Sequence, residues 1–492
     1  MKVKHKAVNA TLWTLVRVGF DQFTSFVVFV VVARLLGPSD VGVFTLGMML
    51  TDFIRVFSTS GFTDAVTKAS PEDEENVARA AFWGNLATSI VCAIFITAMA
   101  PFISILMHAP NLTPILIALA WSTPITAAAG THMARQMRRF GHKTLAIRSL
   151  LSGVIGGGTA VWAAHAGWGV WSLVVQRFIG EGVTMITAFM AFHWLPRFPK
   201  SFDDVKAILP FSLQMSFSKL LTVFISRTHD VVIGAFAGPV QVGVYRVAKR
   251  INDMMTLATT TPLSTVSVNY FVSVREDPVA FRNSFLRIVT ISSTLTFPAF
   301  FGLAAVSDVL TPLLFGHKWD SSILIQQLLA PICVPTVVSL FTIPVLTAFG
   351  QSKKAAQMTT VQLVITVASA LIAAPFGMIA IVCSLLFRLY IMIPYQLIII
   401  EKHTGCSTWE VLVKISKPLG ASLIMAVAVW LSLHSVLAFV PFAFVRLILA
   451  SIEGAAIYIA AIAILDRSSL RWIADMAKGM VGRKLAFGQQ KA

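Results

Sequence analysis

The sequence predicts an all-α polytopic membrane protein with about 14 transmembrane helices. Of its 492 residues, 56% are apolar and only 12% are charged, whereas soluble proteins contain about 25% charged residues. The mean hydropathy is +0.79, and apolar runs of about 20 residues, long enough to cross the hydrocarbon core as a helix, recur along the chain. This composition excludes a soluble enzyme, a disordered scaffold and a disulfide-rich secreted domain.

The apolar runs follow one another along the whole chain. The first six lie at about 11–36, 41–66, 80–106, 113–133, 145–165 and 168–194. The next eight lie at about 207–236, 241–268, 285–309, 322–349, 355–375, 377–400, 415–436 and 441–465. Segments with turn-forming residues, such as Gly37-Pro38-Ser39-Asp40, separate the runs. The seventh and eighth runs contain several charges and are the weakest candidates.

Basic residues gather in alternate connections between the runs. The two tails and the even-numbered connections hold about 27 of the 39 Lys and Arg residues, and the odd-numbered connections hold about two. Cytoplasmic loops of membrane proteins carry this excess of Lys and Arg. We therefore expect both termini in the cytoplasm. The net charge of +17 then reflects membrane topology rather than binding of nucleic acid.

An eight-residue motif occurs twice in the chain. Gly37-Pro38-Ser39-Asp40-Val41-Gly42-Val43-Phe44 follows the first run, and Gly238-Pro239-Val240-Gln241-Val242-Gly243-Val244-Tyr245 follows the seventh, 201 positions later. Phe140-Gly141 with Phe349-Gly350, and Gly169 with Gly377, are further pairs at similar offsets. Each pair relates one run to the sixth run after it. Two similarly oriented halves, related by a pseudo-two-fold axis along the membrane normal, are typical of some transporters. The alternative is chance recurrence of a common turn.

The repeat predicts four parts of the chain. Residues 1–200 form an N-terminal six-helix bundle, and residues 201–402 form a C-terminal six-helix bundle. Residues 403–466 add the thirteenth and fourteenth helices. Residues 467–492 form a basic cytoplasmic tail, in which apolar residues at helical spacing predict an interfacial helix. The alternative is a solvated tail.

Charged residues inside the apolar runs mark the candidate site, because a charge at the centre of a transmembrane helix costs about 2.5–3.5 kcal/mol on insertion scales. The densest group lies on the seventh and eighth runs, with five cations and two anions, a net charge of +3. Its members are Lys219, Arg227, Asp230, Arg246, Lys249, Arg250 and Asp253. Arg388 in the twelfth run has no acidic neighbour within a turn and joins the candidate cations. A positively charged interior of this kind suits an anion such as a diphosphate.

Local ion pairing is the alternative interpretation of these charges. The pairs that would neutralise one another along a helix are Arg227 with Asp230, Arg250 with Asp253, Arg17 with Asp21, Asp52 with Arg55, and Arg177 with Glu181. An acidic side chain that is not neutralised by an ion pair can couple transport to protons or sodium. Asp21 and Asp253 are the candidates for ion coupling.

Motifs for other chemistry are missing from the sequence. It contains no phosphate-binding loop, no His/Cys spacing for a metal and no nucleophile elbow. The hydrophilic connections are too short to hold a catalytic domain. We therefore expect a secondary transporter that is not an enzyme and that has no catalytic residues, cofactor or metal.

Two segments of the chain carry a resemblance to a known family. The first is Ala33-Arg34-Leu35-Leu36-Gly37-Pro38-Ser39-Asp40-Val41-Gly42-Val43-Phe44, and the second is Asp230-Val231-Val232-Ile233-Gly234 with Gly238, Gly243, Tyr245 and Ala248. The sequence resembles the polysaccharide (Wzx-type) flippases of the multidrug/oligosaccharidyl-lipid/polysaccharide exporter superfamily, and within them the succinoglycan-type exopolysaccharide transport proteins.

The resemblance implies a function and a location. It implies two six-helix bundles around a central cationic cavity in the bacterial inner membrane. By alternating access, this cavity would carry a polyprenyl-diphosphate-linked oligosaccharide repeat unit from the cytoplasmic to the periplasmic leaflet. Lys219, Arg227, Arg246, Lys249, Arg250 and Arg388 would contact the head group. Membrane lipids and a polysaccharide polymerase or export complex are the implied partners. The alternatives are a cation-coupled multidrug exporter of the same superfamily and a membrane polymerase or ligase of lipid-linked sugars.

Overall fold

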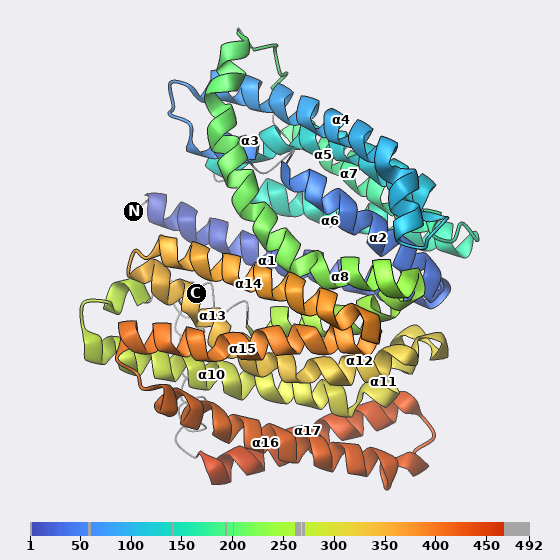
Figure 1. The fold of residues 1–492 in the computed structure, drawn as a ribbon, viewed down its shortest axis with the longest axis vertical. Coiled ribbons are helices and arrows are strands. Elements are labelled where there is room, and N and C mark those ends of the chain that lie inside the picture. Colours follow the sequence, from blue (N-terminus) through green and yellow to red (C-terminus); the bar gives the residue numbers. More distant parts are fainter. Residues whose placement is uncertain are drawn as a thin grey trace, which may run out of the picture. The chain divides into compact units, whose positions relative to one another are not determined.

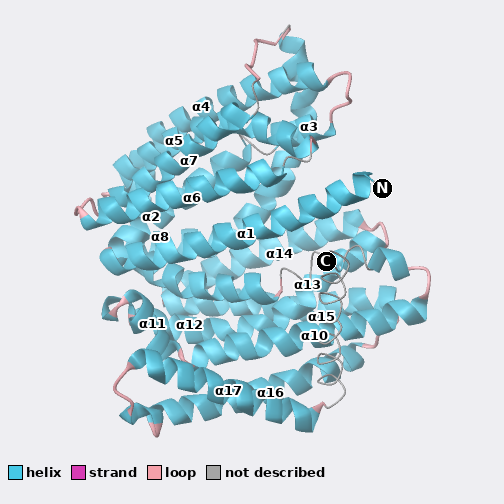
Figure 2. Ribbon diagram, turned by 180° about the vertical axis from the view of Figure 1, so that it is seen from behind, coloured by secondary structure: helices cyan, strands magenta, loops and turns pink. Residues whose placement is uncertain are grey.

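A computed structural model describes residues 2–57, 61–139, 142–191, 194–199, 201–260, 267 and 271–466. Within these residues every regular element is helical, and short loops and turns join the helices (Figures 1 and 2). The chain divides into two compact units. The first contains Met1–Arg246 and Leu363–Ile381, and the second contains Val247–Gln362 and Val382–Ala492.

The first unit contains the N-terminal helices of the chain. In chain order these are α1 (Lys2–Leu35), α2 (Pro38–Arg55), α3 (Gly61–Lys68), α4 (Glu74–Leu106), α5 (Leu112–Arg138), α6 (His142–His165), α7 (Trp171–Ala191) and the greater part of α8 (Phe202–Thr259). Helices α4 and α5 pack together, as do α6 and α7, while α1 lies on α6 and α2 lies on α5. Short connections explain the pairs α4/α5 and α6/α7, since each second helix returns directly along the one before it, whereas α1 with α6 and α2 with α5 are contacts between helices that are not consecutive in the chain.

The remaining helices of the chain belong to the second unit, apart from the segment Leu363–Ile381. They are α10 (Pro278–Ala305), α11 (Ser307–Phe315), η2 (His317–Trp319), α12 (Ser321–Leu329), η3 (Ala330–Ile332), α13 (Cys333–Ala348), α14 (Ser352–Ala373), η4 (Ala374–Phe376), α15 (Met378–Thr404), α16 (Thr408–His434), η5 (Leu437–Phe439) and α17 (Ala443–Leu465). Helices α8, α14 and α15 contribute residues to both units.

Phenylalanines dominate the core of the second unit. Phe271, Phe281, Phe285, Phe297 and Phe341 are fully buried in one cluster that also includes residues of α16. Helix α16 packs against α10 and against α17. The thirteenth and fourteenth helices predicted from the sequence are therefore tied into this unit by apolar contacts.

Side-chain caps define where two helices of the second unit begin. The Asp277 carboxylate accepts hydrogen bonds from the backbone N–H groups of Val279 and Ala280 at the start of α10, both at 3.0 Å. Ser407 and Glu410 form a capping box at the start of α16. Each cap satisfies N–H groups that have no partner in the first turn of a helix.

Twelve helices of the described residues are long and apolar enough to cross a membrane. One of them, Asp203–Thr259, contains a kink at Gly238 and corresponds to two predicted runs. Helix α2 matches the second run but includes Asp40, Asp52 and Arg55 and is too charged to be counted. Each of the fourteen predicted runs thus has a helical counterpart, and the all-α polytopic fold is confirmed.

The two copies of the repeated motif share part of their local structure. Gly37 and Gly238 have ψ angles of 167° and 175°, and in each case the following proline opens a helical segment. Their φ angles differ in sign, −89° at Gly37 and 79° at Gly238, so Gly37 is extended as expected before proline, whereas Gly238 has a backbone conformation that favours glycine. Gly169 and Gly377, before α7 and α15, both have positive φ.

The compact units do not follow the predicted division at residue 200. Residues 201–246 belong to the first unit. The compact units are defined by contacts within the folded chain, whereas the predicted division rests on an internal repeat of the sequence. The one does not test the other, and the four-part division therefore stays a prediction. The predicted interfacial helix in 467–492 lies outside the described residues.

Candidate functional site

Arg227 is the centre of a charged cluster in the first unit. Its Nη2 donates to Asp52 Oδ2 on α2 at 2.6 Å, and its Nη1 donates to Asp230 Oδ2 at 3.3 Å, one turn along α8. Asp230 is buried, and the Arg227 side chain is 23% exposed. The local pair with Asp230 was one of the alternatives read from the sequence. The bond to Asp52 joins two helices that are far apart in the chain.

Helix α7 brings a second arginine pair to this cluster. Arg177 forms an ion pair with Glu181, one turn further along α7, as its i,i+4 spacing predicted. Arg55 at the end of α2 lies 3.9 Å from the same Glu181 carboxylate. Arg177 also interacts electrostatically with Asp52. Helices α2, α7 and α8 thus hold three arginines and three carboxylates close together.

Lys219 lies two turns before Arg227 on α8 and contacts a different helix. Its Nζ is 2.6 Å from Asp64 Oδ2 on α3, and the two side chains are 46% and 31% exposed. Helices α2 and α3 therefore supply a carboxylate to each of the two predicted cations. The expected net charge of +3 on the seventh and eighth runs falls to +1 when Asp52 and Asp64 are added (five cations and four anions).

Asp21, a predicted coupling acid, has a polar environment between α1 and α6. Its side chain forms a hydrogen bond with Ser149 and interacts with Arg17 and Arg148. Arg148 is 6% exposed. Within the described residues, its Nε and Nη1 have no hydrogen-bond partner. The sequence analysis did not single out Arg148, although its position inside the fifth predicted run was a signal that could have found it.

The remaining predicted residues lie on α8 and α15. Arg246 is half-buried and, among the described residues, makes no ion pair. Lys249 Nζ lies 3.7 Å from Asp253 Oδ1, the second predicted coupling acid. Arg250 is half-buried, and Arg388 is buried.

Lys219, Arg227 and Arg246 belong to the first unit, and Lys249, Arg250 and Arg388 belong to the second. Their assembly into one binding site therefore stays a prediction.

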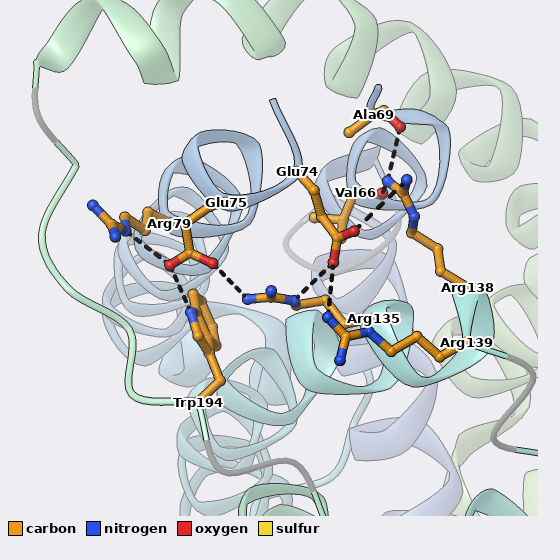
Figure 3. A network of polar contacts seen from close by, with 9 residues as sticks. All are labelled: Val66, Ala69, Glu74, Glu75, Arg79, Arg135, Arg138, Arg139 and Trp194. Atoms are coloured by element: carbon orange, nitrogen blue, oxygen red, sulfur yellow. Dashed lines mark hydrogen bonds and ion pairs between the residues drawn. The ribbon is translucent and has the colours of Figure 1, made fainter. Parts of the chain in front are cut away.

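A second polar network lies where α4 begins and α5 ends (Figure 3). Arg135 donates from Nε to Glu74 at 3.1 Å and from Nη1 to Glu75 at 3.0 Å. The indole N–H of Trp194 donates to Glu75 at 2.9 Å, and the Arg135 guanidinium stacks over the Trp194 ring.

Arg138 extends the same network to α3. It donates to the carbonyl oxygens of Val66 and Ala69 at 2.9 and 2.8 Å (Figure 3). Because Arg135 and Arg138 have carboxylate and carbonyl partners here, this network ties helix ends together and is not a candidate anion site.

Comparisons with known proteins relate both the sequence and the fold to transporters. The polysaccharide biosynthesis protein family matches residues 31–324. The chain is 25% identical over 466 residues to the succinoglycan biosynthesis transport protein ExoT of Rhizobium meliloti (strain 1021), covering 94% of each chain. It is 21% identical over 340 residues to the lipopolysaccharide biosynthesis protein WzxC of Escherichia coli (strain K12), covering 67% of each.

Solved structures share the fold at low sequence identity. The lipid II flippase MurJ in an inward closed conformation matches with a TM-score of 0.74 and 13% identity, over 94% of this chain and all of that chain. An inward-facing multidrug resistance transporter of the MATE family in the MOP superfamily matches with a TM-score of 0.59 and 17% identity, over 80% of this chain and 99% of that chain. The resemblance read from the sequence is confirmed. The chain, a multi-pass membrane protein, belongs to the polysaccharide biosynthesis protein family.

Proposed function

We propose that the protein is a flippase that moves a polyprenyl-diphosphate-linked oligosaccharide repeat unit from the cytoplasmic to the periplasmic leaflet of a bacterial inner membrane. The product would feed exopolysaccharide or lipopolysaccharide synthesis. Membership of the family supports a role in polysaccharide biosynthesis. The names of its relatives, which are a transport protein, a lipopolysaccharide biosynthesis protein and a lipid II flippase, support transport of a lipid-linked sugar.

One observation carries the proposal: three arginines of the first unit, Arg55, Arg177 and Arg227, lie together among membrane-type helices. A diphosphate cannot enter hydrocarbon unaided. In a simple Born estimate each unpaired charge loses on the order of tens of kcal/mol of solvation free energy there. Arginine side chains can replace the lost water with forked hydrogen bonds to phosphate oxygens. A cluster of arginines among membrane-type helices is therefore what this cargo requires.

In this proposal the predicted cations bind the head group. Lys219, Arg227, Arg246, Lys249, Arg250 and Arg388 contact the diphosphate, and Asp253 or Asp21 couples transport to an ion. The protein moves its substrate by alternating access and makes or breaks no bond in it. Both termini lie in the cytoplasm, and a polysaccharide polymerase or export complex takes over the flipped repeat unit.

The test is complementation of a deletion strain with single variants of α8. Arg227→Ala removes charge-assisted hydrogen bonds worth about 1.5–3 kcal/mol each, so we expect transport at low substrate to fall about 10- to 100-fold. Arg227→Lys keeps the charge and should recover part of that loss. Lys206→Ala is the matched control, because Lys206 lies on the same helix, is 64% exposed and forms an exposed ion pair with Asp203 at 3.6 Å.

The readout is the sidedness of lipid-linked repeat units in membrane vesicles. Accumulation on the cytoplasmic side in the deletion strain supports the flippase. The likeness to a multidrug transporter favours drug export as a second candidate. Changed drug sensitivity with normal repeat-unit sidedness would establish that alternative. Altered polymer length with normal sidedness would point to a polymerase or ligase.

A further inference from the structure

Helices α1 and α6 of the first unit pack against each other and run in the same direction. Three contacts along the pair show this direction, because residue numbers rise together on both helices. The contacts are Asp21 with Ser149, Thr24 with Gly153, and Val28 with Gly157. Both helices therefore begin at the same end of the first unit.

Arg148 is a buried cation near this end of α6. It lies one turn inside the apolar part of the helix, which begins at Thr144, and only 6% of the residue is exposed. Its Nε and Nη1 are fully buried and, among the described residues, have no hydrogen-bond partner. Arg135 is equally buried, at 6% exposure, but donates hydrogen bonds to Glu74 and Glu75. A buried charged donor without a partner costs free energy, so Arg148 carries binding capacity that the fold does not use.

Two charged residues of α1 surround this guanidinium. Arg17 and Asp21 interact with Arg148 electrostatically, while the Asp21 carboxylate forms its hydrogen bond with Ser149. Arg17 and Asp21 are half-buried, so the group reaches the protein surface through them and Arg148 is its buried part. We call Arg17, Asp21, Arg148 and Ser149 the α1/α6 cluster. Its net charge is +1 (two cations and one anion).

The α1/α6 cluster is separate from the arginines of α2, α7 and α8. On α6, Gly156 packs against α7, where its Cβ atom would lie 3.1 Å from the carbonyl oxygen of Gln176, the residue before Arg177. Arg148 is eight residues (156 − 148) from this level, which is about 12 Å along the helix. A diphosphate is much shorter than that distance, so it cannot contact Arg148 and Arg177 at the same time.

The charge and the depth of the α1/α6 cluster suit a lipid phosphate group. Each phosphoryl group of a glycosylated polyprenyl diphosphate carries one negative charge, which is the charge that neutralises the cluster. The apolar spans of the two helices begin at Arg17 and Thr144, so Asp21 and Arg148 lie about 6 Å inside them. Head groups meet hydrocarbon at this depth. In the predicted topology, this is the cytoplasmic side of the membrane.

We propose that the α1/α6 cluster is a loading site, in which Arg17 and Arg148 bind one phosphoryl group of the lipid-linked cargo before it moves to the arginines of α2, α7 and α8. Arg148 turns its side chain toward this group and gains the hydrogen-bond acceptor that it lacks. Asp21, held by Ser149, limits the positive charge, so the cargo can leave again. This inference rests on the proposed function, because it assigns the same cargo. It adds an entry site and a binding role for Arg148.

The first experiment compares the thermal unfolding of two arginine variants without ligand. Methionine fills a similar space without charge, so Arg148→Met should leave the melting temperature unchanged or raise it, because it removes unpartnered donors. Arg135→Met is the matched control and should lower the melting temperature, because it breaks two bonds to carboxylates. A fall for Arg148→Met as large as that for Arg135→Met would show that Arg148 has a partner in the fold, and the proposal would be overturned.

The second experiment measures occupancy of the α1/α6 cluster with a cysteine at Phe20. Phe20 is 37% exposed and shares a face of α1 with Arg17, three residues before it. In a background with the four native cysteines replaced by alanine, we expect a short-chain polyprenyl diphosphoglucose to slow maleimide labelling of Phe20→Cys at least threefold. The matching polyprenyl glucoside, which has no phosphate, should leave the rate unchanged. An unchanged rate with the diphosphoglucose overturns the proposal.

Arg148 variants and a second cysteine position test which residues bind. Arg148→Met should abolish the protection of Phe20→Cys, and Arg148→Lys should restore part of it; protection that persists in Arg148→Met refutes its binding role. Phe224→Cys reports on the other arginines, since Phe224 is 41% exposed and lies one turn before Arg227. Protection of Phe224→Cys should survive Arg148→Met. Its loss there would mean that the two levels form one site, and a separate loading site would be refuted.

Two further ligands identify the source of the phosphate group. Equal protection of Phe20→Cys by phosphatidylglycerol would make the α1/α6 cluster a site for ordinary phospholipids. Protection by inorganic phosphate but not by the diphosphoglucose would make it a site for a free anion. Either result overturns the loading site.

The outcomes separate the loading site from the proposed function. If the protein moves repeat units in membrane vesicles while no ligand protects Phe20→Cys, the loading site is wrong and the flippase stands. If protection by the diphosphoglucose depends on Arg148 while a deletion strain keeps normal repeat-unit sidedness, the cluster binds lipid diphosphates and the proposed flippase is wrong.

Discussion

Replacing Gly42 by alanine places one methyl group into the close backbone contact between Gly42 on α2 and Pro239 on α8. The added Cβ would lie 1.7 Å from the Pro239 oxygen, whereas ordinary contacts begin at 3.4 Å, so the two backbones must separate by about 1.7 Å (3.4 − 1.7). Overpacking costs about 1–3 kcal/mol, and the obstacle here is backbone rather than a flexible side chain. Alanine regains about 1 kcal/mol of helix propensity. An overpacking cost near the upper end of this range, reduced by the regained helix propensity, leaves an expected net loss of about 2 kcal/mol.

Thermal unfolding of the purified protein in detergent measures this loss. Gly243→Ala, with a Cβ atom 2.1 Å from the Pro38 oxygen, should lower the melting temperature in the same way. The double variant should cost less than the sum of the two, because both changes strain one contact. Gly158→Ala is the matched control, since its Cβ would meet nothing within 4 Å. If Gly42→Ala melts at the same temperature as Gly158→Ala, the reasoning about this contact is refuted.

Two further predictions concern Arg135 and Cys406, which lie outside the contact between Gly42 and Pro239. Arg135→Ala should destabilise the protein by about 1.5–3 kcal/mol, because it removes the charge-assisted hydrogen bonds to Glu74 and Glu75, while other arginines still pair with both carboxylates; thermal unfolding no worse than that of Lys206→Ala would contradict this. Burial raises the pKa of the Cys406 thiol, so the folded thiol stays protonated where an unfolded thiol, with a pKa of about 8.5, ionises. The contribution of the protonated Cys406 thiol to folding stability is present below the unfolded pKa and is lost as pH rises toward the folded pKa. With the other cysteines replaced, maleimide labelling of Cys406 should therefore be slow near pH 8.5 until the protein unfolds. Labelling as fast as that of a peptide thiol would show that the thiol is accessible.

The helices were predictable because a bilayer imposes simple requirements on sequence. A spanning segment must satisfy its own backbone hydrogen bonds and present apolar side chains, so length and hydropathy alone mark it. The kink at Gly238 was visible as a Gly-Pro pair between two runs. Helix α2 was predicted as the second run, although three charged residues reduce its apolar character. Two of these charged residues, Asp52 and Arg55, form ion pairs with residues of α8 and α7, so their charges are compensated inside the protein.

The candidate site was only partly predictable from the sequence. Spacing along one helix identified the pairs of Arg177 with Glu181 and of Arg227 with Asp230. The pairs of Asp52 with Arg227 and of Asp64 with Lys219 join residues 175 and 155 positions apart. Helical periodicity contains no information about partners at that separation. The net charge of the site around the seventh and eighth runs was therefore overestimated, because the carboxylates of Asp52 and Asp64 were not counted.

The amino-acid sequence by itself determined that this protein is a helical membrane protein with charges in its interior, because burial in lipid selects composition and period residue by residue. Only the tertiary structure decided which charges meet. It also showed that the two copies of the Gly-Pro motif, which the sequence offers merely as a repetition, touch each other through Gly42 and Gly243. A contact between distant backbones depends on how helices pack, and packing is a property of the folded chain as a whole.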